Sequence, residues 1–359
     1  MLAAALPALA ACLSSGSAGS ASTGASATGP TLATGSAPAS PHAVGTPPPA
    51  AMAQQQAFVR VIQQVLPSVV EIRTSTGLGS GVVFDAAGDI VTNAHVVGNA
   101  KTFQVLVSSS AAPLSASLVG SYPADDLAVV RVAGAKNLHP ATFGNSAKLQ
   151  VGDLVLAIGN PLGLQSSVTD GIVSAVGRIV SEPATAEAPG ATLPDTIQTS
   201  AAINPGNSGG ALVDLAGEVV GIPTLAAADQ QEGGAAPGIG FAISSNTVTD
   251  IAGQLIRTGH VTRSHRAALG VTVATVVGTD GQPAGVGVVS VTPGGQAAKA
   301  GLKQGDVITA INGTATPDAA TLSGVLAGLR PGQTVNVAVT RQDGSTANVK
   351  VTLGQLPGS

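Results

Sequence analysis

Short runs of β-branched residues, separated by turn residues, recur between residues 58 and 255 of this 359-residue chain. Such runs fit strands of about four to eight residues, because branched side chains pack well on a pleated surface. Glycine (47) and proline (23) are frequent and favour turns over long helices. The runs are VVEIR at 69–73, GVVF at 81–84, IVT at 90–92, FQVLV at 103–107, LAVVRV at 127–132 and LVLAI at 154–158. This pattern predicts an all-β sandwich or barrel and excludes a coiled coil or helical bundle.

The composition excludes one large class of partner. Charged residues make up 9% of the chain, aromatic residues 2%, and the formal net charge is −4. Binding to a phosphate backbone needs a basic surface, and stacking on bases needs aromatic side chains. We therefore expect no nucleic-acid binding. Cys12 is the single cysteine, which rules out an intrachain disulfide and a thiolate-rich metal cluster.

The N-terminal segment differs from the rest of the chain. Residues 1–59 contain no Asp, Glu, Lys or Arg, and from Leu13 they are almost wholly Ala, Ser, Thr, Gly and Pro. Ordering such a backbone costs about 1–2 kcal/mol per residue, more than its small side chains can offset, so we predict a disordered tether over 1–57. The apolar start ends in LAAC, which is similar to the lipobox of bacterial lipoproteins and makes Cys12 a candidate lipidation site. No basic segment precedes it, so a start further upstream and an unmodified cysteine stay as alternatives.

A smaller α+β unit occupies residues 259–355, after a predicted helix at 244–258. Its strands and tight turns are predicted at 285–291, 312–313, 335–340 and 343–344. Between them, a helix is expected to begin at Thr316-Pro317 and to stop at Pro331-Gly332. The apolar stripe of that helix consists of Leu322, Val325, Leu326 and Leu329. The unit is large enough for its own core.

The sequence GNSGG at 206–210 carries the strongest chemical signal. A serine between glycines on a tight turn is exposed, and successive N–H groups there can hold an oxyanion. The same residues match the G-x-S-x-G motif of α/β-hydrolases, in which the serine lies between a strand and a helix. Here ALV at 211–213 and EVVGI at 218–222 predict a hairpin instead. The α/β-hydrolase alternative therefore fails, and Ser208 is a candidate nucleophile.

A serine nucleophile needs a base and an orienting carboxylate. His95 and His139 are the histidines of the β unit that precede Ser208. His95 lies at the end of a predicted strand, where the barrel can hold it rigidly, whereas His139 lies before a proline in a predicted surface loop. Asp125 and Asp126 directly precede a buried strand. Asp126 adjoins the strand, while Asp125 fits a solvated turn residue equally well.

Six motifs resemble those of the HtrA/Deg family of trypsin-like serine proteases. They are TNAHVV at 92–97, DDLAVVRV at 125–132, IGNPLGL at 158–164, VTDGIVSAVGR at 168–178, IQTSAAINPGNSGGAL at 197–212 and GIGFAI at 238–243. The chain order His95, Asp126, Ser208 is that of chymotrypsin-type enzymes. In the smaller unit, ALGV at 268–271 and GDVI at 305–308 resemble the PDZ domain that such proteases carry.

The resemblance implies a mainly β fold, with two six-stranded antiparallel barrels of the chymotrypsin type over 58–258 and a PDZ domain over 259–355. It implies that Ser208 is the nucleophile, His95 the general base and then acid, and Asp126 the group that fixes the imidazole tautomer. The N–H groups of Gly206 and Ser208 are expected to form the oxyanion hole, worth about 3–4 kcal/mol per donor. Neither a metal nor an organic cofactor is expected.

The family also implies a primary specificity pocket whose base lies six residues before the nucleophile, here Ala202. Because Ala202 offers no carboxylate to Arg or Lys, we expect cleavage after small or medium aliphatic residues. Ile203, Ile222 and Leu225 are candidates for the pocket walls, with ordinary barrel core as the alternative for each.

Two residues depart from the family pattern. Ser200 stands where an aspartate is usual, which is expected to weaken a local hydrogen bond. Pro223 stands where an asparagine is common, which removes a backbone donor.

In the PDZ unit, the N–H groups of Leu269, Gly270 and Val271 are expected to bind the carboxylate of a hydrophobic C-terminal peptide added as a strand. A domain that only packs on the protease is the alternative. Phe58 is the single aromatic residue near the start of the protease unit, where family members trimerise, so a homotrimer stays open.

These expectations combine into an ATP-independent serine endopeptidase of the cell envelope that acts on misfolded or unfolded polypeptides. It is expected to be extracytoplasmic and to meet the membrane only through an N-terminal anchor. The alternative is a chaperone-like or peptide-binding protein whose protease fold is inactive.

Overall fold

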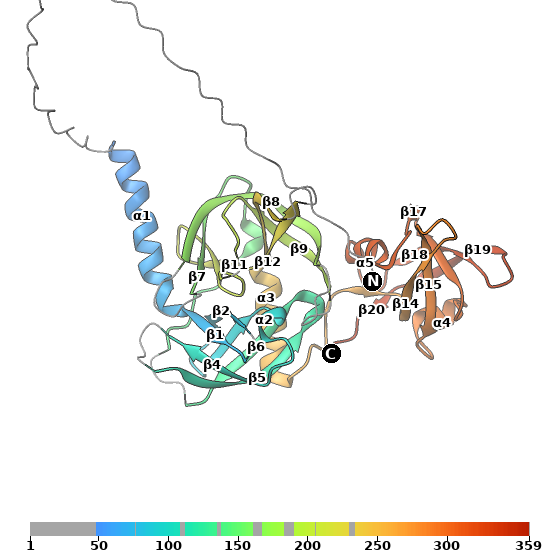
Figure 1. The fold of residues 1–359 in the computed structure, drawn as a ribbon, viewed down its shortest axis with the longest axis horizontal. Helices are drawn as coiled ribbons and strands as arrows, with labels where there is room; N and C mark the ends of the chain where they lie inside the picture. Colours follow the sequence, from blue (N-terminus) through green and yellow to red (C-terminus); the bar gives the residue numbers. More distant parts are fainter. Residues whose placement is uncertain are drawn as a thin grey trace, which may run out of the picture. The chain divides into compact units, whose positions relative to one another are not determined.

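The computed structural model describes residues 48–75, 77–107, 112–134, 138–160, 167–182, 190–204, 206–229 and 234–358. Two closed antiparallel β-barrels come first and a smaller α+β unit follows, which confirms the predicted mainly β fold (Figure 1). Cys12 and His42 lie outside the described residues. No helix in the described ranges is long and apolar enough to cross a membrane.

The first barrel contains the six strands that precede residue 133. Around the barrel, they are β1 (Val69–Arg73), β2 (Leu78–Val83), β3 (Asp89–Thr92), β6 (Leu127–Val132), β5 (Leu114–Tyr122) and β4 (Thr102–Leu106). Along β1, Val70 and Ile72 pack inside the barrel, whereas Val69 packs into the core between the barrels. This alternation is the period of two that a strand imposes.

The second barrel has the same construction. Its strands, in order, are β10 (Ala211–Asp214), β11 (Val219–Asp229), β12 (Gly234–Ser244), β9 (Ala191–Thr199), β8 (Ser167–Glu182) and β7 (Leu154–Gly159). The hairpin predicted after Ser208 is confirmed, because β10 pairs antiparallel with β11. Gly217, at φ 79°, lies in the turn between them.

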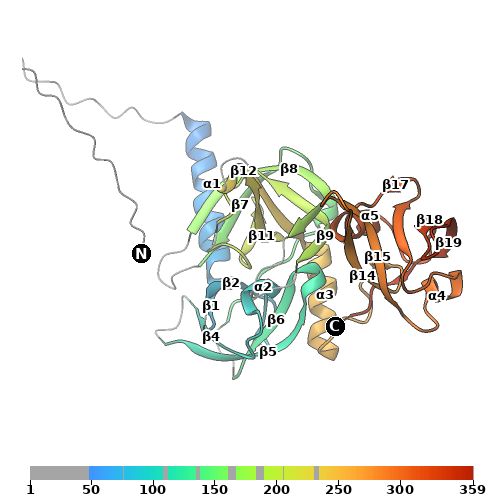
Figure 2. The ribbon, with the colours of Figure 1, turned by 45° about the vertical axis from the view of Figure 1, so that its right-hand side comes forward.

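Helix α3 (Ser245–Thr258) packs against both barrels (Figure 2). Val248, Ile251 and Leu255 lie along one face and are buried in the core between the barrels. Gly259 ends the helix in a left-handed conformation, and its N–H donates to the carbonyl of Leu255 at 2.8 Å. The predicted helix is therefore confirmed to within a residue.

The sequence did not predict helix α1 (Pro49–Val65), which runs into a short 3-10 turn, η1 (Leu66–Ser68), before β1. Residues 49–57 were assigned to the disordered tether, and this assignment is wrong because they are helical. Val61 and Val65, near the end of α1, are buried in the core between the barrels. The composition of this segment does not favour a helix, and the burial of Val61 and Val65 explains why one forms.

Three short helical turns occupy loops of the barrels: α2 (Ala94–Val97), η2 (Pro123–Asp125) and η3 (Ser146–Lys148). His95 belongs to α2, which begins after β3 has ended at Thr92. The prediction that His95 lies at the end of a strand is therefore corrected: His95 lies in a short helix that follows the strand. Asp126 follows η2 directly.

The PDZ-like unit is built on an open antiparallel sheet. Its order is β14 (Val271–Val277), β15 (Pro283–Val291), β16 (Val307–Ile311), β18 (Thr334–Thr340) and β19 (Thr346–Thr352), and β17 (Thr314–Ala315) also pairs with β16. Asn312 (φ 50°) and Gly313 (φ 82°) form the predicted tight turn between β16 and β17.

Helices α4 (Gln296–Ala300) and α5 (Ala319–Ala327) complete the unit. The side chain of Asp318 caps α5 by accepting from the N–H of Thr321 at 2.7 Å, so α5 begins two residues later than predicted. It also ends earlier, before Gly328. The first and last strands, β13 (Ala267–Ala268) and β20 (Gly354–Gln355), pair with each other.

Candidate active site

The carboxylate of Asp126 holds His95 at two points. Nδ1 of the imidazole lies 2.8 Å from Oδ2, and the backbone N–H of His95 donates to Oδ1 at 2.9 Å. The Asp126 side chain is 3% exposed and that of His95 is 35% exposed. A buried carboxylate at Nδ1 keeps the proton there and leaves Nε2 as the basic nitrogen.

The backbone of Asp126 is itself held in place. It adopts a left-handed conformation (φ 49°, ψ 41°) directly after η2. Its carbonyl accepts hydrogen bonds from the N–H of Ala94 at 3.1 Å and from the Asn93 amide at 3.0 Å. Its own N–H donates to the carbonyl of Pro123 at 3.1 Å. These contacts tie Asp126 to the turn that carries His95.

Thr224 of β11 connects Ser208 to this pair. The Thr224 hydroxyl donates to Oδ2 of Asp126 at 2.6 Å, and its backbone carbonyl accepts from the Ser208 hydroxyl at 3.1 Å. The structure thus brings all three sequence-predicted residues to one place. The sequence analysis did not single out Thr224, which lies in β11 directly after Pro223.

Ser80 of β2 is a second residue that the sequence did not single out. Its N–H donates to the carbonyl of Ser208 at 3.0 Å, and its hydroxyl donates to the carbonyl of Gly206 at 2.6 Å. The same hydroxyl accepts from the N–H of Asn160 at 2.8 Å. Ser80 is fully buried and anchors the loop at 206–210, called the nucleophile loop below because it carries the candidate nucleophile Ser208, to the first barrel.

Close packing explains the glycine after Ser208. Gly209 has φ 79°, and a Cβ there would lie 2.3 Å from the carbonyl oxygen of Ser80 and 2.5 Å from Oγ1 of Thr92. Both the backbone conformation and the lack of space therefore require glycine. The N–H of Gly209 donates to the carbonyl of Pro223 at 3.0 Å.

The N–H of Gly206, a predicted oxyanion donor, is hydrogen-bonded within its own loop. Its N–H donates to the carbonyl of Asn204 at 2.7 Å, and the N–H of Asn207 reaches the same carbonyl at 3.1 Å. Pro205 lies outside the described residues. In this structure Gly206 therefore does not offer its N–H to a substrate, which corrects the expectation for that donor.

The predicted pocket residues separate into distinct environments. Ala202 is exposed. Ile203 is 5% exposed and packs in the second barrel, against Gly240. Ile222 is fully buried in the core between the barrels, so its assignment to a pocket wall is wrong. The side chain of Leu225 lies outside the described residues.

The departure at Ser200 keeps its local hydrogen bonds. The Ser200 hydroxyl accepts from the N–H of Ile172 at 3.0 Å, and the Ser200 N–H donates to the carbonyl of Ile172 at 3.1 Å. The hydroxyl therefore serves as the acceptor at this position.

Asp125 is not the solvated turn residue that one alternative proposed. It is 3% exposed, and Oδ1 accepts from Nη1 of Arg266 at 2.9 Å. Burial raises the pKa of the Asp125 carboxyl to about 6, and the charge of Arg266 partly opposes this rise. His139, as predicted, is exposed.

The predicted carboxylate loop of the PDZ-like unit leads into an edge strand. The carbonyl of Leu269 accepts from the N–H of Ala297 at 3.1 Å, and that of Gly270 accepts from Thr292 at 3.0 Å. Gly270 has φ 79°, and Val271 begins β14 at the edge of the sheet. An edge strand next to such a loop can accept an added peptide strand. Across the described ranges, no group of three or more His, Cys, Asp or Glu side chains is placed to hold a metal ion.

Comparison with known proteins agrees with this geometry. Residues 79–222 match the trypsin-like peptidase domain, and residues 262–353 match the PDZ domain. The serine protease PepD of Mycobacterium tuberculosis is 40% identical over 327 residues, covering 86% of this chain and 68% of PepD. The periplasmic serine endoprotease DegP of Escherichia coli K12 is 41% identical over 283 residues, covering 77% of this chain. The chain spans only 57% of the length of that DegP.

Solved structures give the same result. The HtrA-type protease AlgW with a decapeptide superposes with a TM-score of 0.55 at 33% identity, covering 84% of this chain and 99% of AlgW. The serine endoprotease from Yersinia pestis superposes with a TM-score of 0.55 at 35% identity, covering 83% and 98%. Two barrels with this site and a following PDZ domain define a trypsin-like serine endopeptidase. The chain belongs to the HtrA/Deg family of serine proteases.

Proposed function

We propose that the chain is an ATP-independent endopeptidase of the cell envelope that cleaves misfolded or unfolded proteins. The observation that carries the catalytic assignment is the 2.8 Å contact between Nδ1 of His95 and Oδ2 of Asp126, with Ser208 joined to the same carboxylate through Thr224. The cellular assignment is supported by the similarity to DegP, which is a periplasmic enzyme. An extracytoplasmic location, with an N-terminal anchor, is part of this proposal.

The reaction follows from the arrangement of the three side chains. Ser208 Oγ attacks the carbonyl carbon of the scissile peptide, while Nε2 of His95 takes the hydroxyl proton. Asp126 holds Nδ1–H and stabilises the imidazolium that forms. His95 then gives its proton to the leaving amine, and an acyl-enzyme forms on Ser208. A water molecule, deprotonated by His95, hydrolyses the acyl-enzyme and restores the serine.

We infer that turnover needs two local changes. The Ser208 hydroxyl has to leave the carbonyl of Thr224 to give its proton to Nε2 of His95. The N–H of Gly206 has to leave the carbonyl of Asn204 before it can join Ser208 as an oxyanion donor. These two hydrogen bonds support the proposal that the nucleophile loop has a resting form.

Small or medium aliphatic residues are the proposed specificity. Ala202 is exposed and carries no charge. Ile239 is 38% exposed on β12, next to the Gly240 that packs against Ile203. An apolar surface without a carboxylate favours side chains such as valine over arginine. The PDZ-like unit is proposed to bind hydrophobic C-terminal peptides along β14.

Active-site labelling tests the proposal. A fluorophosphonate probe is expected to label the wild type, and the wild type is expected to hydrolyse unfolded casein. Ser208→Ala should lose both, whereas Ser115→Ala, which changes an exposed serine of β5, should lose neither. Casein hydrolysis that persists in Ser208→Ala contradicts the assignment. A wild type that suppresses aggregation without any cleavage favours the chaperone-like alternative.

A further inference from the structure

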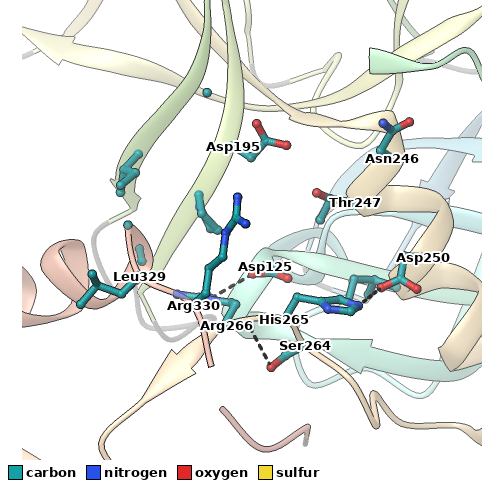
Figure 3. A pocket seen from close by; sticks show the side chains of 16 residues that line it. Asp125, Asp195, Asn246, Thr247, Asp250, Ser264, His265, Arg266, Leu329 and Arg330 are labelled. Atoms are coloured by element: carbon teal, nitrogen blue, oxygen red, sulfur yellow. Dashed lines mark hydrogen bonds and ion pairs between the residues drawn. The ribbon is translucent and has the colours of Figure 1, made fainter. Parts of the chain in front are cut away.

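A cavity of about 700 Å³ lies where β8, β9 and α3 face the start of the PDZ-like unit (Figure 3). Asp125 and Arg266 lie on its wall, joined by the ion pair drawn in Figure 3. Arg266 lies within the PDZ match at 262–353 and outside the peptidase match at 79–222. Arg266 of the PDZ segment thus contacts Asp125, the residue directly before Asp126.

The contact anchors the whole η2 turn rather than one side chain. Nη1 of Arg266 donates to Oδ1 of Asp125 at 2.9 Å and also to the backbone carbonyl of Ala124. The side chains of Arg266 and Asp125 are 11% and 4% exposed. A buried carboxylate is unfavourable without a compensating charge, so the pair is mutually dependent.

The backbone of Arg266 is held by a hydrogen bond within the PDZ-like unit. Its carbonyl accepts from the N–H of Leu356 at 2.8 Å, next to the pairing of β13 with β20. The neighbouring Ser264 hydroxyl donates to the carbonyl of Leu356 at 2.7 Å. The Arg266 side chain therefore extends from backbone that hydrogen bonds to Leu356 hold in place.

The turn that Arg266 anchors is hydrogen-bonded to the backbone of Asp126. The N–H of Asp126 donates to the carbonyl of Pro123, at the start of η2, and the residue has a left-handed conformation. Aspartate tolerates that conformation better than most residues, and here hydrogen bonds on both sides of the residue hold it. Ala94 and Asn93 hold the carbonyl of Asp126 on one side, and the η2 turn holds its N–H on the other.

We propose that Arg266 is a positioning residue for catalysis, which fixes the Asp126 carboxylate against His95 by anchoring the Ala124-Asp125 turn. The PDZ segment thereby contributes to the alignment of the catalytic site. This inference rests on the proposed role of Asp126 as the orienting carboxylate.

Four full-length proteins test the inference: the wild type, Arg266→Ala, Arg266→Lys and Arg330→Ala. Arg330 lines the same cavity and is exposed, so its variant controls for loss of positive charge there. Arg266→Ala is expected to lower kcat on casein or a peptide substrate by about 10-fold to 100-fold, the size of effect that misalignment produces. KM should stay within about twofold, because Arg266 lies outside the proposed substrate pocket.

Arg266→Lys provides the rescue. Both hydrogen bonds come from the single atom Nη1, so one ammonium group can make them and should restore most of kcat. The acid limb of the kcat/KM pH profile should move to lower pH in Arg266→Ala, because a rotated Asp126 stabilises the imidazolium less. A contact that only joins two domains would lower thermal stability and leave this profile unchanged.

The His95 ring, followed by NMR through its titration, gives a readout that does not need turnover. The midpoint of this titration should fall in Arg266→Ala and recover in Arg266→Lys, and Arg330→Ala should have the wild-type midpoint.

A folded Arg266→Ala with wild-type kcat and titration overturns the inference, as does an Arg266→Lys that is no better than Arg266→Ala. If Arg266→Ala does not fold, Arg266→Met takes its place, because it keeps the length of the side chain and removes the donor atom. A lower kcat and a lower His95 midpoint in Arg266→Met support the inference, and wild-type values of both contradict it. An inactive wild type with the expected NMR shifts contradicts the proposed function but supports the positioning role.

Discussion

The Thr224 hydroxyl and the Asp126 carboxylate are joined by a 2.6 Å hydrogen bond to Oδ2, the same oxygen that lies 2.8 Å from Nδ1 of His95. Thr224 is buried and comes from the second barrel, while Asp126 and His95 come from loops of the first. The hydrogen bond therefore fixes the carboxylate across the boundary between the barrels.

Thr224→Val tests this bond, because the substitution removes the hydroxyl and keeps the shape. We expect kcat to fall at least tenfold and the free energy of unfolding to fall by about 1–3 kcal/mol, since a buried carboxylate oxygen loses its donor. Kinetics and urea unfolding measure the two effects. Thr346→Val, at an exposed position of β19, should change neither. Wild-type kcat in Thr224→Val would show that the carboxylate is oriented without this hydrogen bond.

Gly209→Ala should prevent the nucleophile loop from packing on β2. The new Cβ would overlap the Ser80 carbonyl in addition to the strain of a positive φ. Gly281→Ala is a matched control, because Gly281 has φ 78° and no heavy atom within 4 Å of a Cβ. The control should lose about 1 kcal/mol from strain alone, and Gly209→Ala several times more. Equal losses in urea unfolding would mean that the loop moves aside freely.

Ser80→Ala should uncouple the nucleophile loop from the first barrel. The carbonyl of Gly206 and the N–H of Asn160 lose their shared partner, so we expect a loss of about 1–3 kcal/mol in unfolding free energy. A lower kcat with unchanged KM should accompany it, because the loop carries Ser208. Ser323→Ala, at an exposed position of α5, serves as the control. A change in KM alone would place Ser80 in substrate binding instead.

Asp125 makes an unusual contribution to the pH dependence of stability. Its pKa is about 6 in the folded chain, raised from 3.8 mainly by burial. The folded state therefore takes up this proton before the unfolded state does, so its contribution to stability rises as pH falls from about 6 toward 4. Relative to Asp125→Asn, the wild type should gain about 2 kcal/mol between pH 7.5 and pH 4.5. Urea unfolding at both pH values measures this gain, and a difference that does not vary with pH would contradict it.

The elements with strong local patterns were predictable from the sequence. The six strand runs and helix α3 satisfy simple periodicities, and Asn312-Gly313 fits the turn that it forms. His95, Asp126 and Ser208 could be selected because each lies in a distinctive motif, and the structure brings them together.

The remaining features depend on contacts between distant residues. Asp125 is buried because Arg266, 141 positions later, supplies its charge, and nothing near Asp125 in the sequence signals this. Thr224 lies 98 positions from Asp126, and Ser80 lies 126 from Gly206. Helix α1 forms where Val61 and Val65 can be buried, which local composition does not indicate. The hydrogen bond from the N–H of Gly206 to the carbonyl of Asn204 depends on the path of the loop backbone, which the residue types alone do not specify.

The pairing of β13 with β20, together with the bond from the Leu356 N–H to the Arg266 carbonyl, brings the two ends of the PDZ-like unit to one point. The backbone enters and leaves this unit side by side. Exchange of this unit for a related one would therefore leave the backbone path of the barrels unchanged, and the exchanged unit would need an arginine at position 266 to keep the contact with Asp125.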